Sequence, residues 1–217
     1  MALITATEAK VLLPALSGTG ADTSIDTMIS RAGQALAEYC AFPAVAGAGP
    51  TLEQTTYTMY LDGLDEDARR PEVLQLPLRP IVSVTSVYDD ADRAYGSSAQ
   101  VAEADHFSVD KTGGALVLLG TSTHAWSVNA FEALKVVAVC GLTAGSIPEL
   151  VKAAVAVTVQ ANWSKRHTAT ADQVGVGGDT FAPSKVPYFV PAEAKGLIAP
   201  WVLWERKLSG AREVRFA

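Results

Sequence analysis

The chain has 217 residues, of which 49% are hydrophobic and 18% are charged, and its formal net charge is −6 at pH 7. This length suits one large domain or a domain with an elaborated insert, and the composition predicts a folded core and argues against a disordered chain. The acidic balance disfavours nucleic-acid binding, because contacts to phosphates need a basic surface.

The start of the chain and its two cysteines bear on its location. Met1 to Thr5 show neither the basic nor the long apolar region of a signal peptide, and no stretch reaches the roughly 20 apolar residues of a membrane span. Cys40 and Cys140 are expected to be small buried thiols rather than a disulfide framework. These features predict a protein made and used in a reducing cytosol.

Two helices are expected at the start of the chain. Thr5 and Glu8 form the capping-box pattern, a hydroxyl followed three residues later by a carboxylate, and predict a helix over residues 5–16. The next segment carries apolar residues at helical spacing and predicts a second helix over residues 22–41.

A β region is expected next, over about residues 53–140. Its first strand, near residues 54–61, has the β-branched and aromatic content typical of strands. The fold class is therefore expected to be α+β, with a helical scaffold of about four helices and an inserted antiparallel β region. Further strands are expected over residues 73–77, 81–88, 105–110, 115–119 and 133–140.

The clearest helix start lies at Pro148 and Glu149. Proline loses no hydrogen bond at the first helical position, and a carboxylate in the first turn favours the positive end of the helix dipole. The predicted helix, residues 149–166, is apolar on most sides, so it should be buried either in its own core or against neighbouring subunits. The candidate subunit-interface residues are Val151, Val155, Val159 and Trp163.

The C-terminal part combines aromatic and basic residues. We expect one domain over residues 1–190, followed by a C-terminal helix and tail over residues 191–217. Residues 195–217 carry five basic and two acidic side chains, so the tail either docks on an acidic partner or is simply solvated. Aromatic residues and arginine are enriched at interfaces, although the tryptophans could instead close the core. The candidate docking residues are Trp201, Trp204, Arg206, Lys207, Arg212, Arg215 and Phe216.

No pattern in the sequence supports catalysis or a cofactor. The three histidines, His106, His124 and His167, lack the spacing of a helical metal pair, and no Cys-x-x-Cys is present. The acidic cluster that begins at Asp62 does not follow the calcium-loop pattern. No Gly-x-Ser-x-Gly or phosphate-binding loop occurs either. We therefore expect no metal, no cofactor and no enzymatic activity.

Five short segments follow one another in a recognisable order. They are Gln54-Thr55, Leu76–Val87, His106–Asp110, Lys135–Gly145 and Pro148–Ala154. The second reads Leu-Pro-Leu-Arg-Pro-Ile-Val-Ser-Val-Thr-Ser-Val, and the last begins Pro-Glu-Leu-Val-Lys. In this order and spacing, the segments resemble the head–tail connector (adaptor) family of tailed bacteriophages and related gene-transfer particles. The resemblance extends from about Ile25 to Arg166 and finds no clear match beyond Thr168.

The resemblance implies a non-enzymatic structural protein of the virion neck. Such adaptors form a ring, commonly of twelve subunits, beneath the portal, where they extend the DNA channel and link head to tail. The implied partners are the portal protein, a stopper or tail-completion protein, and genome DNA that passes through without sequence-specific binding; no membrane is involved. The protein would be made in the bacterial host cytoplasm, and its C-terminal tail would dock on the portal.

Two alternatives stay open at this point. A stopper or tail-completion protein of the same neck would also build a ring, but would contact the adaptor and the tail rather than the portal. An intracellular enzyme or ligand-binding domain would need a polar pocket, for example around His106 or His124.

Overall fold

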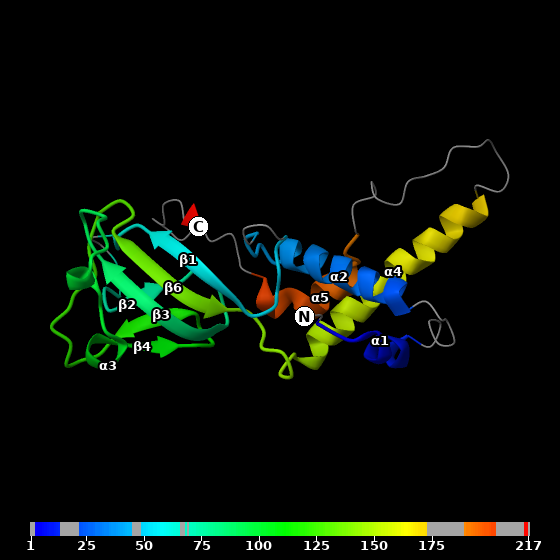
Figure 1. Cartoon of the computed structure of the whole chain (residues 1–217), viewed down its shortest axis with the longest axis horizontal. Helices are drawn as coiled ribbons and strands as arrows, with labels where there is room; N and C mark the ends of the chain where they lie inside the picture. Colours follow the sequence, from blue (N-terminus) through cyan, green and yellow to red (C-terminus); the bar gives the residue numbers. More distant parts are fainter. Residues whose placement is uncertain are drawn as a thin grey trace. The chain divides into compact units, whose positions relative to one another are not determined.

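The computed structural model describes residues 3–13, 22–44, 49–65, 68, 70–172, 189–202 and 215–216, with backbone alone at 22–24, 164–172 and 215. Its elements form two compact units, one helical and one β (Figure 1). The helical unit takes in Met1–Cys40 and Ala144–Val202, and the β unit Ala41–Thr143 and Leu203–Ala217. This division differs from the expected single domain over residues 1–190 with a separate C-terminal part, because the last helix belongs to the helical unit.

Two helices open the helical unit, α1 (Ala6–Leu12) and α2 (Asp22–Tyr39). The predicted capping box is present: the Thr5 hydroxyl accepts a hydrogen bond from the Glu8 amide at 3.2 Å, and the Glu8 carboxylate accepts one from the Thr5 amide at 2.8 Å. The bond from the Thr5 amide is the main reason that the pKa of Glu8 lies below its ordinary value. The helix ends at Leu12, with Leu13 as its C-cap, and so does not run on to residue 16 as predicted. Leu13 precedes Pro14, and the residue before a proline disfavours the helical conformation. Residues 14–16 themselves lie outside the described residues.

The long helix α4 (Glu149–Asp172) begins where the sequence predicts and continues six residues past the predicted end at 166. No glycine or proline occurs between residues 166 and 172 to stop it. Helix α4 packs against α2 and against α5 (Ala192–Ile198), which a 3₁₀ turn, η3 (Ala199–Trp201), follows (Figure 1). Among the described residues, no helix combines the length and the apolar character needed to cross a membrane.

The β unit contains two antiparallel sheets. The strand order of the first is β3 (Ile81–Asp89), β6 (Leu134–Cys140), β1 (Thr55–Leu61) and β7 (Arg215–Phe216). That of the second is β2 (Val73–Gln75), β5 (Ala115–Leu118) and β4 (Phe107–Asp110). Two short helices, η2 (Ser97–Ala99) and α3 (Glu103–His106), precede β4.

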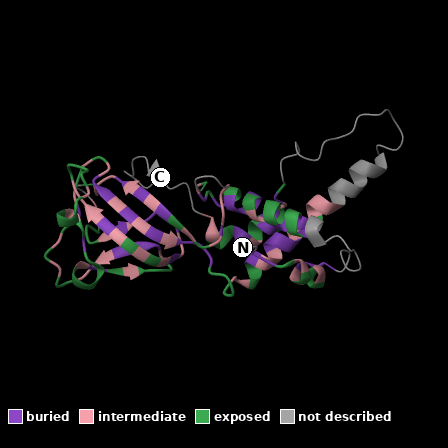
Figure 2. Ribbon diagram, viewed as in Figure 1, coloured by how far each residue is buried: buried purple, intermediate pink, exposed green. Residues whose placement is uncertain are grey.

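All six predicted strands are present, and the expected α+β class is confirmed. Helix α3 replaces the first two residues of the strand expected over 105–110. In β6, the side chains alternate between buried and half-buried along the whole strand, and β1 shows the same alternation over most of its length (Figure 2). The buried side chains, among them Met59 of β1 and Val136 of β6, form the core face of the first sheet.

Candidate assembly site

The structure separates the predicted docking residues into three groups. Trp201 lies in η3, at the end of the described part of the helical unit, and is half-buried. Arg215 and Phe216 form strand β7 of the β unit. The remaining four lie outside the described residues: Trp204, Arg206, Lys207 and Arg212. The structure therefore does not bring Trp201 together with Arg215 and Phe216 in one unit.

Strand β7 (Arg215–Phe216) pairs with the edge of β1. Phe216 pairs with Met59 and Arg215 with Tyr60, in antiparallel register. The Phe216 ring meets the buried ring of Tyr57 edge to face, with 6.4 Å between ring centroids. From the sequence, this segment is expected to be a tail without regular structure. The one signal was the alternation of polar and apolar residues over 213–216, which is too short to predict a strand.

A cluster of three tyrosines and a lysine lies on the outer face of the first sheet. Strand register places Lys135 of β6 between Tyr60 of β1 and Tyr88 of β3. The Lys135 ammonium lies 5.3 Å from the ring centroid of Tyr88, 5.4 Å from that of Tyr95 and 6.0 Å from that of Tyr60. Tyr95 donates a hydrogen bond from its hydroxyl to the carbonyl of Glu132. Such half-exposed aromatic and cationic surfaces are typical of protein interfaces.

No local pattern in the sequence indicates the tyrosine–lysine cluster around Lys135. Its members are up to 75 positions apart in the chain, so only the register of three strands brings them together. Desolvation raises the pKa of Tyr95 above its ordinary value, with a further contribution from Glu132.

The candidate subunit-interface residues of α4 lie in two different environments. Val151, Val155 and Val159 are fully buried inside the helical unit, at 0% exposure. Their side chains offer no surface to a neighbouring subunit, and α4 is apolar there because it packs against helices of its own chain. Trp163, one turn further along, is half-buried. Of the four candidates, Trp163 is therefore the one with surface left for such a contact.

Other apolar side chains that the sequence did not single out are exposed. Val11 and Leu12 at the end of α1 are 77% and 43% exposed, and Val128 and Phe131 in the loop before β6 are 48% and 54% exposed. Arg93 stacks over the Phe131 ring, 5.8 Å from its centroid. Exposed apolar residues mark interaction surfaces where they form a contiguous patch.

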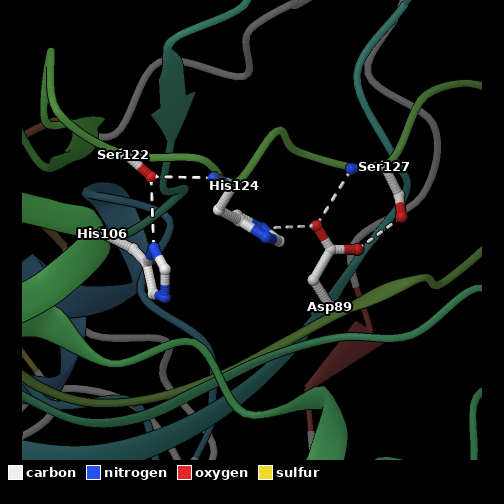
Figure 3. A network of polar contacts seen from close by, with 5 residues as sticks. All are labelled: Asp89, His106, Ser122, His124 and Ser127. Carbon is white, nitrogen blue, oxygen red and sulfur yellow. Dashed lines mark hydrogen bonds and ion pairs between the residues drawn. The ribbon is translucent and has the colours of Figure 1, made fainter.

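A polar network lies at the end of β3 (Figure 3). The Asp89 side chain is only 3% exposed, and its Oδ2 lies 3.0 Å from both His124 Nε2 and the Ser127 amide nitrogen. The Ser127 hydroxyl donates to Asp89 Oδ1. The Ser122 hydroxyl accepts from the His124 amide at 3.0 Å and lies 3.2 Å from Nδ1 of His106.

The geometry of this network anchors a loop and does not assemble a nucleophile. In a catalytic triad, one imidazole bridges the serine and the carboxylate. Here Ser122 contacts the ring of His106, whereas Asp89 contacts that of His124. Within the described residues, no three His, Cys, Asp or Glu side chains are grouped to hold a metal ion. The network therefore fixes His124 and Ser127 to the end of β3 and Ser122 to His106.

Comparison with known proteins gives matches among solved structures only. No protein-family model matches, and neither does any curated protein. A chain from the neck of an empty gene transfer agent particle, solved with C6 symmetry, is 15% identical; the alignment covers 92% of this chain and 88% of that one, with a TM-score of 0.52.

Two further matches come from the same kind of particle. A chain from the neck of a native particle solved with C12 symmetry is 16% identical over 90% of this chain and 89% of that one, at a TM-score of 0.47. A chain from the virion of a native particle is 16% identical. The alignment covers 92% of this chain and 89% of that one, with a TM-score of 0.48. From the first comparison, the fold expected from the resemblance is confirmed: this chain folds like a protein of the neck of a gene transfer agent particle.

Proposed function

We propose that this protein is a non-enzymatic head–tail adaptor, a structural component that forms a ring beneath the portal of a tailed phage or phage-like particle. One observation carries the proposal: the fold is shared with a neck protein over 92% of this chain and 88% of that one. The coverage includes both the helical and the β unit, so the likeness is not that of one common subdomain.

A ring is supported by the symmetry of the neck particles, which were solved as C6 and C12 assemblies. Ring closure needs head-to-tail contacts between different surfaces of one subunit. The exposed Val11 and Leu12, the half-buried Trp163 and the tyrosine–lysine cluster around Lys135 are available for such contacts. We propose a ring of twelve, made in the bacterial host cytoplasm and placed in the virion neck.

The net charge of the chain supports the proposed channel role. A net charge of −6 per subunit, repeated around a ring, surrounds the channel with negative potential. Genome DNA carries the same sign and would pass without sticking, which is what a conduit needs.

Attachment to the portal is assigned to the C-terminal segment. The 13 residues after Trp204 would span roughly 45 Å if fully extended. They carry Arg206, Lys207 and Arg212, whose charge suits an acidic portal surface. Twelve weakly binding tails acting together would attach firmly through effective concentration. Since Arg215 and Phe216 pair with β1, we now place the portal contact on the segment before them.

The alternative is a stopper or tail-completion protein, which shares the neck location and ring building. Portal binding separates the two. The test is electron microscopy of the purified protein mixed with the portal protein encoded near it. A ring stacked coaxially on the portal supports the adaptor proposal; two folded partners that fail to bind would favour the stopper.

A charge-matched pair of variants sharpens this test. Replacing Arg206, Lys207 and Arg212 with alanine should weaken portal binding. The control removes three exposed positive charges elsewhere, by alanine at Arg31, Arg70 and Lys111. Both variants change the net charge equally, so weaker binding by the first alone assigns the contact to the tail. Equal binding by both would remove the tail from the proposal.

A further inference from the structure

Strand β1 has one edge that is only partly covered. All seven residues from Thr55 to Leu61 pair with β6, whereas on the opposite edge β7 pairs with Met59 and Tyr60 alone. Within the part of the chain that the structure describes, Thr55–Thr58 have no strand partner on that side.

The strand itself, Thr55–Leu61, carries none of the in-strand features that commonly prevent pairing with another chain. Exposed edge strands are commonly blunted by lysine, proline or a bulge. β1 reads Thr-Thr-Tyr-Thr-Met-Tyr-Leu and contains neither lysine nor proline, and its register with β6 runs without a shift. An uncharged, regular edge is the kind of surface that accepts an added strand from another chain.

The contacts that hold β7 do not depend on which copy supplies it. They are backbone pairing at two positions and the edge-to-face contact of Phe216 with Tyr57. Backbone pairing is independent of chain connectivity, and the Tyr57 ring, two residues from the Met59 position that Phe216 faces, favours an aromatic side chain at Phe216. The C-terminal strand of a second copy would therefore form the same contacts.

The chain that leads to β7 is long enough for exchange. The described part of the helical unit ends at Val202, and twelve residues, 203–214, separate it from Arg215. Fully extended, these residues span up to about 45 Å. This length exceeds the roughly 30 Å diameter of a small domain.

We propose that, in the assembled ring, the Arg215–Phe216 strand of each copy pairs with the β1 edge of a neighbouring copy. The inference rests on the proposed ring. Opening the intrachain pairing costs only a two-residue strand, and the same contacts form again between subunits. Every copy both gives and receives a strand, so a closed ring leaves no β1 edge without its partner. Each exchanged strand then links two subunits without any new surface.

Mixing two single variants tests the exchange directly. One preparation carries Tyr60→Cys and the other Arg215→Cys, two positions that lie opposite each other in the β1–β7 register. Opposite residues of antiparallel strands have Cα atoms about 4.5–5.5 Å apart, which suits a disulfide. Neither variant can form this bond within one chain. After assembly and oxidation, exchange produces a disulfide-linked dimer that appears in the mixture alone and disappears on reduction.

Controls remove the other sources of a dimer band. Thr56→Cys replaces Tyr60→Cys in the matched control, since it lies on the same face of β1 but about 13 Å along the strand, too far for the bond. Cys40 and Cys140 are buried, and burial raises the pKa of each thiol to about 12, so neither should contribute. Circular dichroism of each single variant checks that the substitution leaves the fold intact.

The outcomes separate this inference from the proposed function. Rings seen by electron microscopy together with the mixture-specific dimer support strand exchange. Rings that form without this dimer, while the doubly substituted Tyr60→Cys, Arg215→Cys chain oxidises to a monomer band, overturn the exchange and leave the adaptor proposal standing. Failure of the folded protein to form a ring on the portal overturns the adaptor proposal, and the exchange with it.

Discussion

The Asp89 carboxylate accepts a hydrogen bond from the backbone amide of Ser127 at 3.0 Å, which joins the end of β3 to a loop 38 residues further along. The same carboxylate lies 3.0 Å from the His124 ring and accepts from the Ser127 hydroxyl. One buried side chain thus holds three groups of the loop, and the loop in turn positions the exposed Val128 and Phe131.

Asp89→Ala should therefore destabilise the β unit strongly. It leaves a half-buried amide, a hydroxyl and an imidazole without their acceptor, which we expect to cost about 2–4 kcal/mol of unfolding free energy. Asp92→Ala, which removes an exposed carboxylate three positions away, should change stability by less than about 0.5 kcal/mol. Urea unfolding of the two variants measures the difference, and equal midpoints would show that the network does not hold the loop.

Two valine-to-alanine substitutions test the helical core. Val155→Ala removes atoms from a fully buried position of α4 and should lower the unfolding free energy by about 1–3 kcal/mol. Val11→Ala, at a side chain that is 77% exposed, should have an effect below about 0.5 kcal/mol. Thermal or urea unfolding reports both. A large loss from Val11 and none from Val155 would contradict the packing described for α4.

Trp163→Ala tests the remaining interface candidate on α4. If this half-buried ring contacts the next subunit, its loss should weaken ring assembly by roughly tenfold or more. Sedimentation across a concentration series measures the assembly constant, and unfolding of the unassembled subunit provides the control. A variant that loses subunit stability while its rings assemble normally would show that Trp163 packs within its own chain and does not contact the next subunit.

Removing the C-terminal strand should reduce stability slightly, while removing the whole tail should also abolish portal attachment. Phe216→Ala loses the edge-to-face contact with Tyr57, for which we expect about 1 kcal/mol. A chain that ends at Trp204 should lose a similar amount, stay folded and fail to bind the portal. Circular dichroism and portal co-sedimentation test the two effects separately. If the shortened chain binds the portal normally, the tail is not the portal-docking segment.

Alkaline pH should destabilise the fold. Burial raises the pKa of Cys40 and Cys140 from 9.0 to about 12 each, and chiefly burial raises that of Tyr57 from 10.0 to about 12. Between about pH 9 and 12, the unfolded chain therefore loses these protons while the folded chain keeps them, so stability falls as pH rises. The contribution is complete below pH 9 and disappears as pH passes through 12.

Denaturant unfolding at pH 8, 9, 10 and 11 measures this slope. Each fully shifted group contributes up to about 1.4 kcal/mol per pH unit. The variant with alanine at Cys40 and Cys140 should show a shallower slope than the parent chain. Parallel slopes for the two proteins would mean that the thiols do not titrate as their burial implies.

Local patterns in the sequence determined most of the elements. The Thr5 and Glu8 capping box, the apolar spacing of α2, and the Pro148-Glu149 helix start each depend on neighbours a few residues away, and each predicted element is present. The same holds for the six strands, whose alternation or β-branched content is visible within one segment. The α+β class followed from these local signals.

Tertiary structure alone decided the rest. A buried helix face looks the same in a sequence whether its own chain or a neighbour covers it, so the burial of Val151, Val155 and Val159 within the subunit required the packing of α2, α4 and α5.

The placement of β7 and the tyrosine–lysine cluster around Lys135 likewise needed strand register, which joins residues far apart in the chain. Sequence determines what each segment tends to be because propensity is local, whereas the surfaces that build an assembly arise from long-range contacts that no single segment encodes.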